Sequence, residues 1–131
     1  MNTELLYLVL VTLLTGLMWV FYVLDRFAVW GLTDTLGYPD APKPQSRWAG
    51  RLIKAHANGV ENLVVFATLV LVAQVAGISN EVTATAAILY FWARVAHVVT
   101  YALAVPWART VAFLAGVVAQ LMIAWQLLAA A

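Results

Sequence analysis

The chain has 131 residues, of which 65% are hydrophobic and only 10% are charged, and its formal net charge is +1. A soluble domain carries about 25% charged residues, so this composition excludes a soluble globular protein and indicates an integral membrane protein. The small net charge gives no support for nucleic-acid binding. Because the chain has no cysteine, any thiol that takes part in its chemistry must come from another molecule.

The first predicted membrane span covers residues 5–24, which include no charged residue. A helix needs about 20 apolar residues to cross ~30 Å of hydrocarbon. We do not expect a cleaved signal peptide, because Glu4 precedes the apolar stretch, no positive residue does, and the stretch is too long. Asp25 and Arg26 follow, and residues 37–44 then form a connector in which three prolines exclude a regular helix.

Three further spans are predicted over about residues 47–76, 81–104 and 107–128, with Ser46 as the cap of the second and Pro106 ending the third. At 1.5 Å per residue the second helix is about 45 Å long, which exceeds the hydrocarbon core. Its polar first half is therefore expected at the interface or inside a bundle. The predicted fold is all-α, a single domain of residues 1–131 that forms an up-and-down four-helix membrane bundle.

The positive residues predict the orientation of the bundle. The two termini and the second loop hold no lysine or arginine, whereas Arg109 adjoins the third loop. The first connector and its flanks hold five, which are Arg26, Lys43, Arg47, Arg51 and Lys54. By the positive-inside rule, both termini face outward and the polar residues face the cytoplasm. We expect this membrane to be a bacterial inner membrane.

Polar residues recur at helical spacing on three of the predicted helices. Steps of three and four place each set on one face of its helix. Exposing a charged side chain at mid-bilayer costs at least ~2.5 kcal/mol, so these faces are predicted to point at a shared polar space. The sets are Arg47, Arg51, Lys54, Asn58 and Glu61 on the second helix, Tyr90, Arg94, His97 and Tyr101 on the third, and Arg109, Phe113, Gly116 and Gln120 on the fourth.

A structural network is one interpretation of these residues, with Glu61 neutralising the cations Arg51, Lys54 and Arg94. One carboxylate cannot pair with all of them, however. The excess of positive charge favours an anionic ligand, and Glu61 is then free to bind a ligand ammonium group.

Two other classes of site are disfavoured. A metal site made of His56, His97 and Glu61 would lie among cations and would lack a close pair of ligands. A small multidrug exporter of four spans would need a carboxylate inside its first helix, and no acidic residue occurs between Glu4 and Asp25.

Two segments resemble a known family. Residues 51–63, followed by Phe66, resemble the second-helix signature of the membrane-associated proteins in eicosanoid and glutathione metabolism (MAPEG). Residues 93–101, followed by Arg109 and Thr110, resemble the third- and fourth-helix motif of the microsomal glutathione transferases and prostaglandin E synthases of that family. The resemblance extends over essentially the whole chain, and the two motifs together are specific.

The resemblance implies a homotrimer that binds glutathione as a cosubstrate between subunits, near the cytoplasmic side, while a hydrophobic electrophile or lipid substrate enters from the membrane. It makes Arg109 the residue that activates the thiol, with Tyr101 as a second catalytic candidate. Lys54 stands where catalytic members usually have arginine. The positions that match glutathione-binding residues are Arg51, Lys54, Asn58, Glu61, Arg94, His97 and Tyr101, and we add Arg26 from the polar pair after the first span.

These residue types suit glutathione chemically. Glutathione has two carboxylates, one ammonium group and one thiol, so its site needs several cations, one anion and a group that favours the thiolate. A free thiol has a pKa near 8.5, and a nearby arginine lowers it. Arg109 stands at the start of the fourth helix, where the helix dipole acts in the same direction. The sequence therefore predicts a glutathione-dependent transferase or peroxidase, and the alternative is a non-catalytic lipid-binding membrane scaffold.

Overall fold

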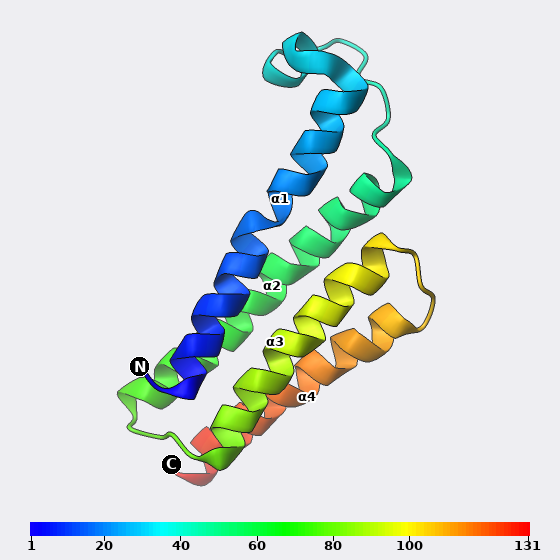
Figure 1. The fold of residues 1–131 in the computed structure, drawn as a ribbon. Coiled ribbons are helices and arrows are strands. Elements are labelled where there is room, and N and C mark those ends of the chain that lie inside the picture. The colour runs from blue at the N-terminus through cyan, green and yellow to red at the C-terminus, as the bar shows by residue number, and fades with distance from the viewer.

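A computed structural model describes residues 1–131 as an up-and-down bundle of four helices (Figure 1). They are α1 (Thr3–Leu36), α2 (Arg47–Val75), α3 (Glu81–Ala102) and α4 (Ala108–Ala129). By length and composition, each of the four is long and apolar enough to cross a membrane. The predicted all-helical, four-span fold is confirmed. Both termini lie at the same end of the bundle (Figure 1).

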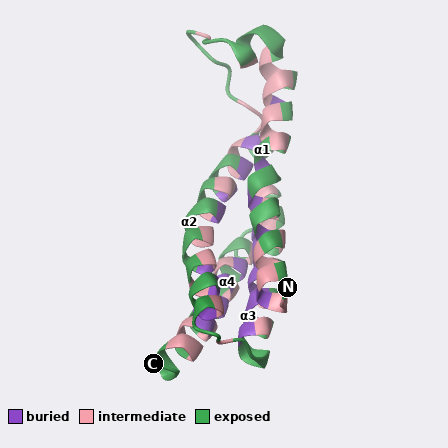
Figure 2. Cartoon of the chain, turned by 90° about the vertical axis from the view of Figure 1, so that its left-hand side faces the viewer, coloured by how far each residue is buried: buried purple, intermediate pink, exposed green.

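Small residues and two stacked aromatic rings form the core. Phe66 of α2 stacks on Tyr90 of α3 with 3.8 Å between ring centres. Alanines at positions 73, 86, 87 and 119 are fully buried and let the helices approach closely. Buried residues line the inside of the bundle, and the outward surface is largely exposed (Figure 2). That outward surface is rich in leucine, valine and aromatic residues, as a surface that faces lipid requires.

The first helix extends well past the predicted span of residues 5–24. It continues through Asp25 and Arg26 to Leu36 and bends at Gly31, whose backbone (φ 79°, ψ 173°) favours glycine. The proline-rich connector that follows is not helical, as expected. The end of α1 and this connector extend beyond the other helices (Figure 1).

Asp25 fastens the connector to α1. Its buried carboxylate accepts hydrogen bonds from the backbone N–H of Ser46 (3.1 Å) and from the Gln45 amide (3.2 Å). The Gln45 amide also donates to the carbonyl of Tyr22 (2.8 Å). Ser46 occupies the predicted N-cap position of α2, but its side chain makes no capping hydrogen bond. The Asp25–Arg26 pair thus holds the path of the connector, and its hydrogen bonds within the chain go to Gln45 and Ser46 and not to the polar residues of the other helices.

Hydrogen bonds close the end of the bundle that holds the termini. The carboxylate of Glu4 is buried and accepts hydrogen bonds from the hydroxyls of Ser79 (2.9 Å) and Thr83. The side chain of Asn2 donates to the Gln74 carbonyl oxygen (2.8 Å), while the Gln74 amide nitrogen is buried without a partner. This end therefore ties the start of α1 to the turn between α2 and α3.

Candidate functional site

Two adjoining pockets lie at the end of the bundle opposite to the termini. The larger has a volume of about 480 Å³, and the smaller about 270 Å³. Because they share Tyr101, Arg109 and Thr110, we treat them as one site and call it the polar groove. Its remaining lining residues are Arg51, Ala104, Val105, Pro106 and Trp107 in the larger pocket and Asn58, His97 and Phe113 in the smaller.

Arg109 and Tyr101 form the centre of the polar groove. The guanidinium carbon of Arg109 lies 4.6 Å from the centre of the Tyr101 ring, in a cation–π contact between the first turn of α4 and the end of α3. The Tyr101 ring in turn meets His97 edge-on, with 5.5 Å between ring centres. This contact uses the positive charge of Arg109 and none of its N–H donors. Arg109 is exposed, so these donors can reach a ligand in the groove.

Arg94 lies beneath the groove and does not line it. Its side chain is buried, and its Nη2 atom donates to Asn58 Oδ1 (2.9 Å) and lies 3.3 Å from His97 Nδ1. Gly59 and Gly116 pack beside it: a Cβ at Gly59 would lie 3.6 Å from Nη2 and one at Gly116 would lie 3.9 Å from Cδ, both ordinary contact distances. Arg94 therefore positions two residues of the groove, Asn58 from α2 and His97 from α3.

Arg51 joins α2 to the end of α3. Its Nε atom donates to the carbonyl oxygen of Ala102 at 2.9 Å. The carbonyls in the last turn of a helix have no partner within that helix, and the partial negative charge there attracts a cation. Arg51 also lines the larger pocket. This contact fixes one positive charge in the groove.

Lys54 and Glu61 are exposed and line neither pocket, although they belong to the same polar face as Arg51 and Asn58. Arg51 and Asn58 are seven residues apart, and so are Lys54 and Glu61, so each pair follows its own line along α2. Three residues correspond to about 300°, which separates the two lines by about 60°. In the single chain, the line of Arg51 and Asn58 faces the groove, whereas Lys54 and Glu61 lie outside it. In the single chain, therefore, only part of this polar face points into the groove.

Arg26 is not part of the groove either. Its guanidinium carbon lies 5.0 Å from the centre of the Trp30 ring, and its Nε atom donates to the Gln45 side chain (3.2 Å). Trp30 itself donates to the carbonyl of Lys43 (2.6 Å). These contacts keep Arg26 with the connector, so the structure does not bring it to the other predicted binding residues.

The interpretation of the cations as a network around Glu61 finds no support in the hydrogen bonds. Those of Arg51 and Arg94 go to neutral partners, and Glu61 is exposed. The chain also has no group of three or more histidine, cysteine or acidic side chains that could hold a metal ion. His56, the other histidine, instead accepts or donates a hydrogen bond with the hydroxyl of Tyr22 (2.8 Å) between α2 and α1.

Sequence reasoning missed the apolar wall of the groove. The loop between α3 and α4 supplies it, through Ala104, Val105, Pro106 and Trp107. Pro106 marked the loop, but nothing local in the sequence indicated that Ala104 and Trp107 adopt positive φ angles of 56° and 67°. The groove thus combines arginine donors with an apolar wall.

Together, the fold and the groove define a four-span membrane protein with a cationic groove at one end. The chain belongs to the MAPEG family, because the model of that family matches residues 4–129, nearly the whole chain. Neither the curated proteins nor the solved structures gave a match to the chain. The family includes glutathione transferases and peroxidases as well as non-catalytic members.

Proposed function

We propose that this protein is a glutathione-dependent transferase or peroxidase that acts on lipophilic electrophiles or lipid hydroperoxides. The observation that carries the proposal is the polar groove itself, in which Arg51, Tyr101 and Arg109 meet from three different helices. Asn58 and His97 extend it with neutral hydrogen-bonding groups. Family membership supports glutathione as the cosubstrate.

In this proposal Arg109 stabilises the thiolate of glutathione, and Arg51 binds one of its carboxylates. The guanidinium fork suits a carboxylate, and a positive charge beside the sulfur lowers the pKa of the thiol. In the transferase reaction the thiolate sulfur forms a bond to the electrophilic carbon, and the leaving group departs with the bonding electrons. In the peroxidase reaction the sulfur bonds to the terminal peroxide oxygen as the O–O bond breaks, and the alkoxide takes up a proton and leaves as the alcohol. The glutathione sulfenic acid that results reacts with the thiol of a second glutathione to give the disulfide and water. Tyr101 donates a hydrogen bond to the thiolate.

Lys54 and Glu61 support a site shared between copies of this chain. Both are exposed in the single chain, and a charged side chain that faces hydrocarbon costs at least ~2.5 kcal/mol. A neighbouring subunit with glutathione at the interface removes this cost, because Glu61 then pairs with the ligand ammonium and Lys54 with a carboxylate. We propose a homotrimer on this basis. A mass measurement in mild detergent is expected to give a trimer, and a stable monomer would contradict the shared site.

The groove is proposed to face the cytoplasm. Arg51 and Arg109 line it, and Lys43 and Arg47 lie near the same end of the bundle, where the positive-inside rule places cations. Both termini, at the opposite end, then face outward from what we propose to be a bacterial inner membrane.

Glutathione binding to the purified protein in detergent tests this function. Calorimetry should give saturable binding to the wild type, and mixing should raise the ultraviolet absorbance of the thiolate. Glu61→Gln should weaken binding by about 1.5–3 kcal/mol through loss of the ammonium partner, which is roughly 10- to 150-fold in Kd. Glu81→Gln is the matched control, because Glu81 is an exposed glutamate in the first turn of α3, at the other end of the bundle.

The two possible failures of this experiment have different meanings. Unchanged affinity in Glu61→Gln would remove Glu61 from the site and leave the function standing. No binding of glutathione to the wild type would contradict the function.

A non-catalytic lipid-binding scaffold is the second candidate function. An entirely apolar pocket of about 290 Å³ favours it, and this pocket lies where α1, α2 and α3 meet near the groove end. Its lining residues are Phe21, Trp48, Leu52, Val98, Val99, Ala102 and Leu103. A scaffold should retain bound lipid through purification and should bind no glutathione, so the same calorimetry separates the two functions.

A further inference from the structure

Arg94 contacts two residues of the groove through a single nitrogen atom. Its Nη2 donates to Asn58 Oδ1 at 2.9 Å and lies 3.3 Å from His97 Nδ1. A guanidinium group has donors and no acceptor, so His97 Nδ1 accepts this hydrogen bond and carries no hydrogen itself. Arg94 and His97 are each only 3% exposed, which keeps water from competing for the contact. The contact therefore decides where the imidazole of His97 carries its hydrogen.

His97 is held as a neutral ring with its hydrogen on Nε2. A neutral imidazole has one N–H, and its place is set by the hydrogen bond that the other nitrogen makes. Protonation of Nδ1 would set an N–H against that of Arg94 and add a second positive charge beside it. The smaller pocket also holds Tyr101 and Arg109, and neither pocket is lined by a carboxylate or by any residue of α1. No group there offsets the charge of an imidazolium, and His97 Nε2 makes no hydrogen bond within the chain.

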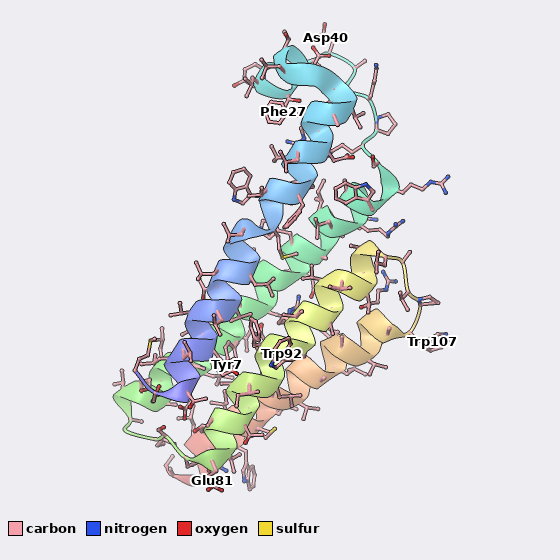
Figure 3. The ribbon with its side chains drawn as sticks, in the orientation of Figure 1. Tyr7, Phe27, Asp40, Glu81, Trp92 and Trp107 are labelled. Carbon is pink, nitrogen blue, oxygen red and sulfur yellow. The ribbon has the colours of Figure 1, made fainter.

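The same nitrogen of Arg94 orients the amide of Asn58. Asn58 Oδ1 accepts from Arg94 and, at 3.4 Å, from the amide of Asn62, so the amide nitrogen of Asn58 is the polar atom left for a ligand. Asn58 and His97 both line the smaller pocket. It adjoins the larger pocket at the end of the bundle marked by Trp107, opposite to Glu81 (Figure 3). Two helices thus bring neutral N–H donors, and no acceptor from these two side chains, to one pocket.

We propose that Arg94 is a positioning residue, which holds Asn58 and His97 so that the smaller pocket binds a hydrogen-bond acceptor of the ligand. This proposal rests on the proposed function and concerns the same site. In glutathione the acceptor is a carbonyl or carboxylate oxygen, and the ammonium group, which has only donors, binds elsewhere. His97 then is not the base that takes the thiol proton, because neither of its ring nitrogens has a lone pair available.

The first experiment reads the tautomer and does not depend on glutathione. The chain has only two histidines, so nitrogen NMR of protein with isotope-labelled histidine, compared with His97→Gln, assigns each ring. We expect His97 to be neutral, with the hydrogen on Nε2, from about pH 5 to pH 8, a range in which an ordinary histidine changes its charge. A hydrogen on Nδ1, or a cationic ring at neutral pH, would overturn the proposal, and this wild-type measurement needs no variant of Arg94 to fold.

Arg94→Met tests whether Arg94 is the cause. Methionine has no N–H to give to Nδ1, so both tautomers of His97 should appear in the same spectrum. A folded Arg94→Met protein in which His97 keeps the hydrogen on Nε2 alone would overturn the positioning role.

The second experiment measures glutathione affinity by calorimetry. His97→Phe keeps a ring and loses the donor, so Kd should rise about tenfold, whereas His97→Gln keeps an amide N–H near the place of Nε2 and should stay within about threefold of wild type. His56→Phe is the control, because His56 bonds to Tyr22 between α1 and α2 and lines neither pocket. Equal weakening by the two His97 variants, or none in His97→Phe, would overturn the proposal.

The pH dependence of the rate separates a donor from a base. His97→Gln should keep the wild-type shape of the profile of kcat against pH, whereas loss of its rising limb would mark His97 as the base and overturn the proposal. If the wild type binds no glutathione, the function fails, and the NMR experiment still decides what Arg94 does to His97.

Discussion

The turn between α2 and α3 and the loop between α3 and α4 end their preceding helices in the same way, but with different residues. In both, an N–H just after the helix bonds to the carbonyl five residues earlier, at 2.8 and 2.9 Å. This motif needs one residue in the left-handed region, which is Gly77 (φ 69°) after α2 and Ala104 (φ 56°) after α3. Glycine adopts this conformation without strain, and alanine does not.

The contrast extends to the residues around each connection. Next to the first, Asn80 caps α3 in a capping box with Thr83, and Glu4 is buried among hydroxyl partners. Next to the second, Trp107 leaves α4 without a cap, and Arg109 is exposed. One end of the bundle is thus arranged for stability. The other keeps strained backbone and available donors, which a ligand can use.

The largest effect on stability is expected at Glu4. Glu4→Ala removes the buried acceptor of the Ser79 and Thr83 hydroxyls, and hydrogen bonds to a charged group contribute about 1.5–3 kcal/mol. Thermal unfolding in detergent should show a clear fall in Tm. Asp40→Ala is the control, because Asp40 is exposed in the connector and its loss should change the stability by less than about 0.5 kcal/mol. Equal Tm values for the two variants would mean that this end is not held by Glu4.

The next effect in size is catalytic and concerns Arg109. Arg109→Ala should raise the pKa of bound glutathione by about one unit, which is about 1.4 kcal/mol and a roughly tenfold lower kcat near neutral pH. Because the loss lies in the thiolate fraction, raising the pH should recover part of the rate relative to wild type, while Tm and glutathione affinity change little. Arg47→Ala is the control, an exposed cation near the same end that lines neither pocket.

If Arg109→Ala and the wild type have the same activity, another residue must activate the thiol. If Arg109→Ala matches the wild type from about pH 6 to pH 9 with a reactive aromatic electrophile, Arg109 does not stabilise the thiolate. Tyr101, whose ring it covers, is then the next candidate.

The fold could be predicted from sequence because bilayer thickness sets the length of each apolar segment and proline, glycine and asparagine mark the turns. Part of the site could be predicted for a similar reason. Helical spacing placed Tyr101 and His97 on one face of α3, and the loops brought Arg51 and Arg109 to the same end. These features depend only on local periodicity and on the alternation of the spans.

What could not be predicted depends on packing. The two lines of polar residues on α2 are about 60° apart, and the rotation of α2 against its neighbours decides that Asn58 faces the groove while Glu61 does not. The contacts of Asp25 with the connector could not be predicted either, because they depend on the path of ten non-helical residues, 37–46. The strain at Ala104 also leaves no trace in sequence, since the glycine that usually marks such a position is absent.

Exchanging glycine and alanine at the two left-handed positions, 77 and 104, tests the comparison of the two connections. The effects expected from these substitutions are the smallest. Gly77→Ala should destabilise the chain by about 1 kcal/mol, and since a Cβ there would meet no atom within 4 Å, the cost comes from the backbone alone. Ala104→Gly should stabilise it by a similar or smaller amount, because relief of the left-handed alanine is partly offset by the greater entropy of glycine in the unfolded chain. Thermal unfolding in detergent measures both.

If strain in the α3–α4 loop serves the groove, Ala104→Gly should also lower the rate with an aromatic electrophile while raising Tm, as is common where activity depends on a strained site. A loss of stability in Ala104→Gly would show that this end of α3 is not strained, and the distinction between the two connections would then fall.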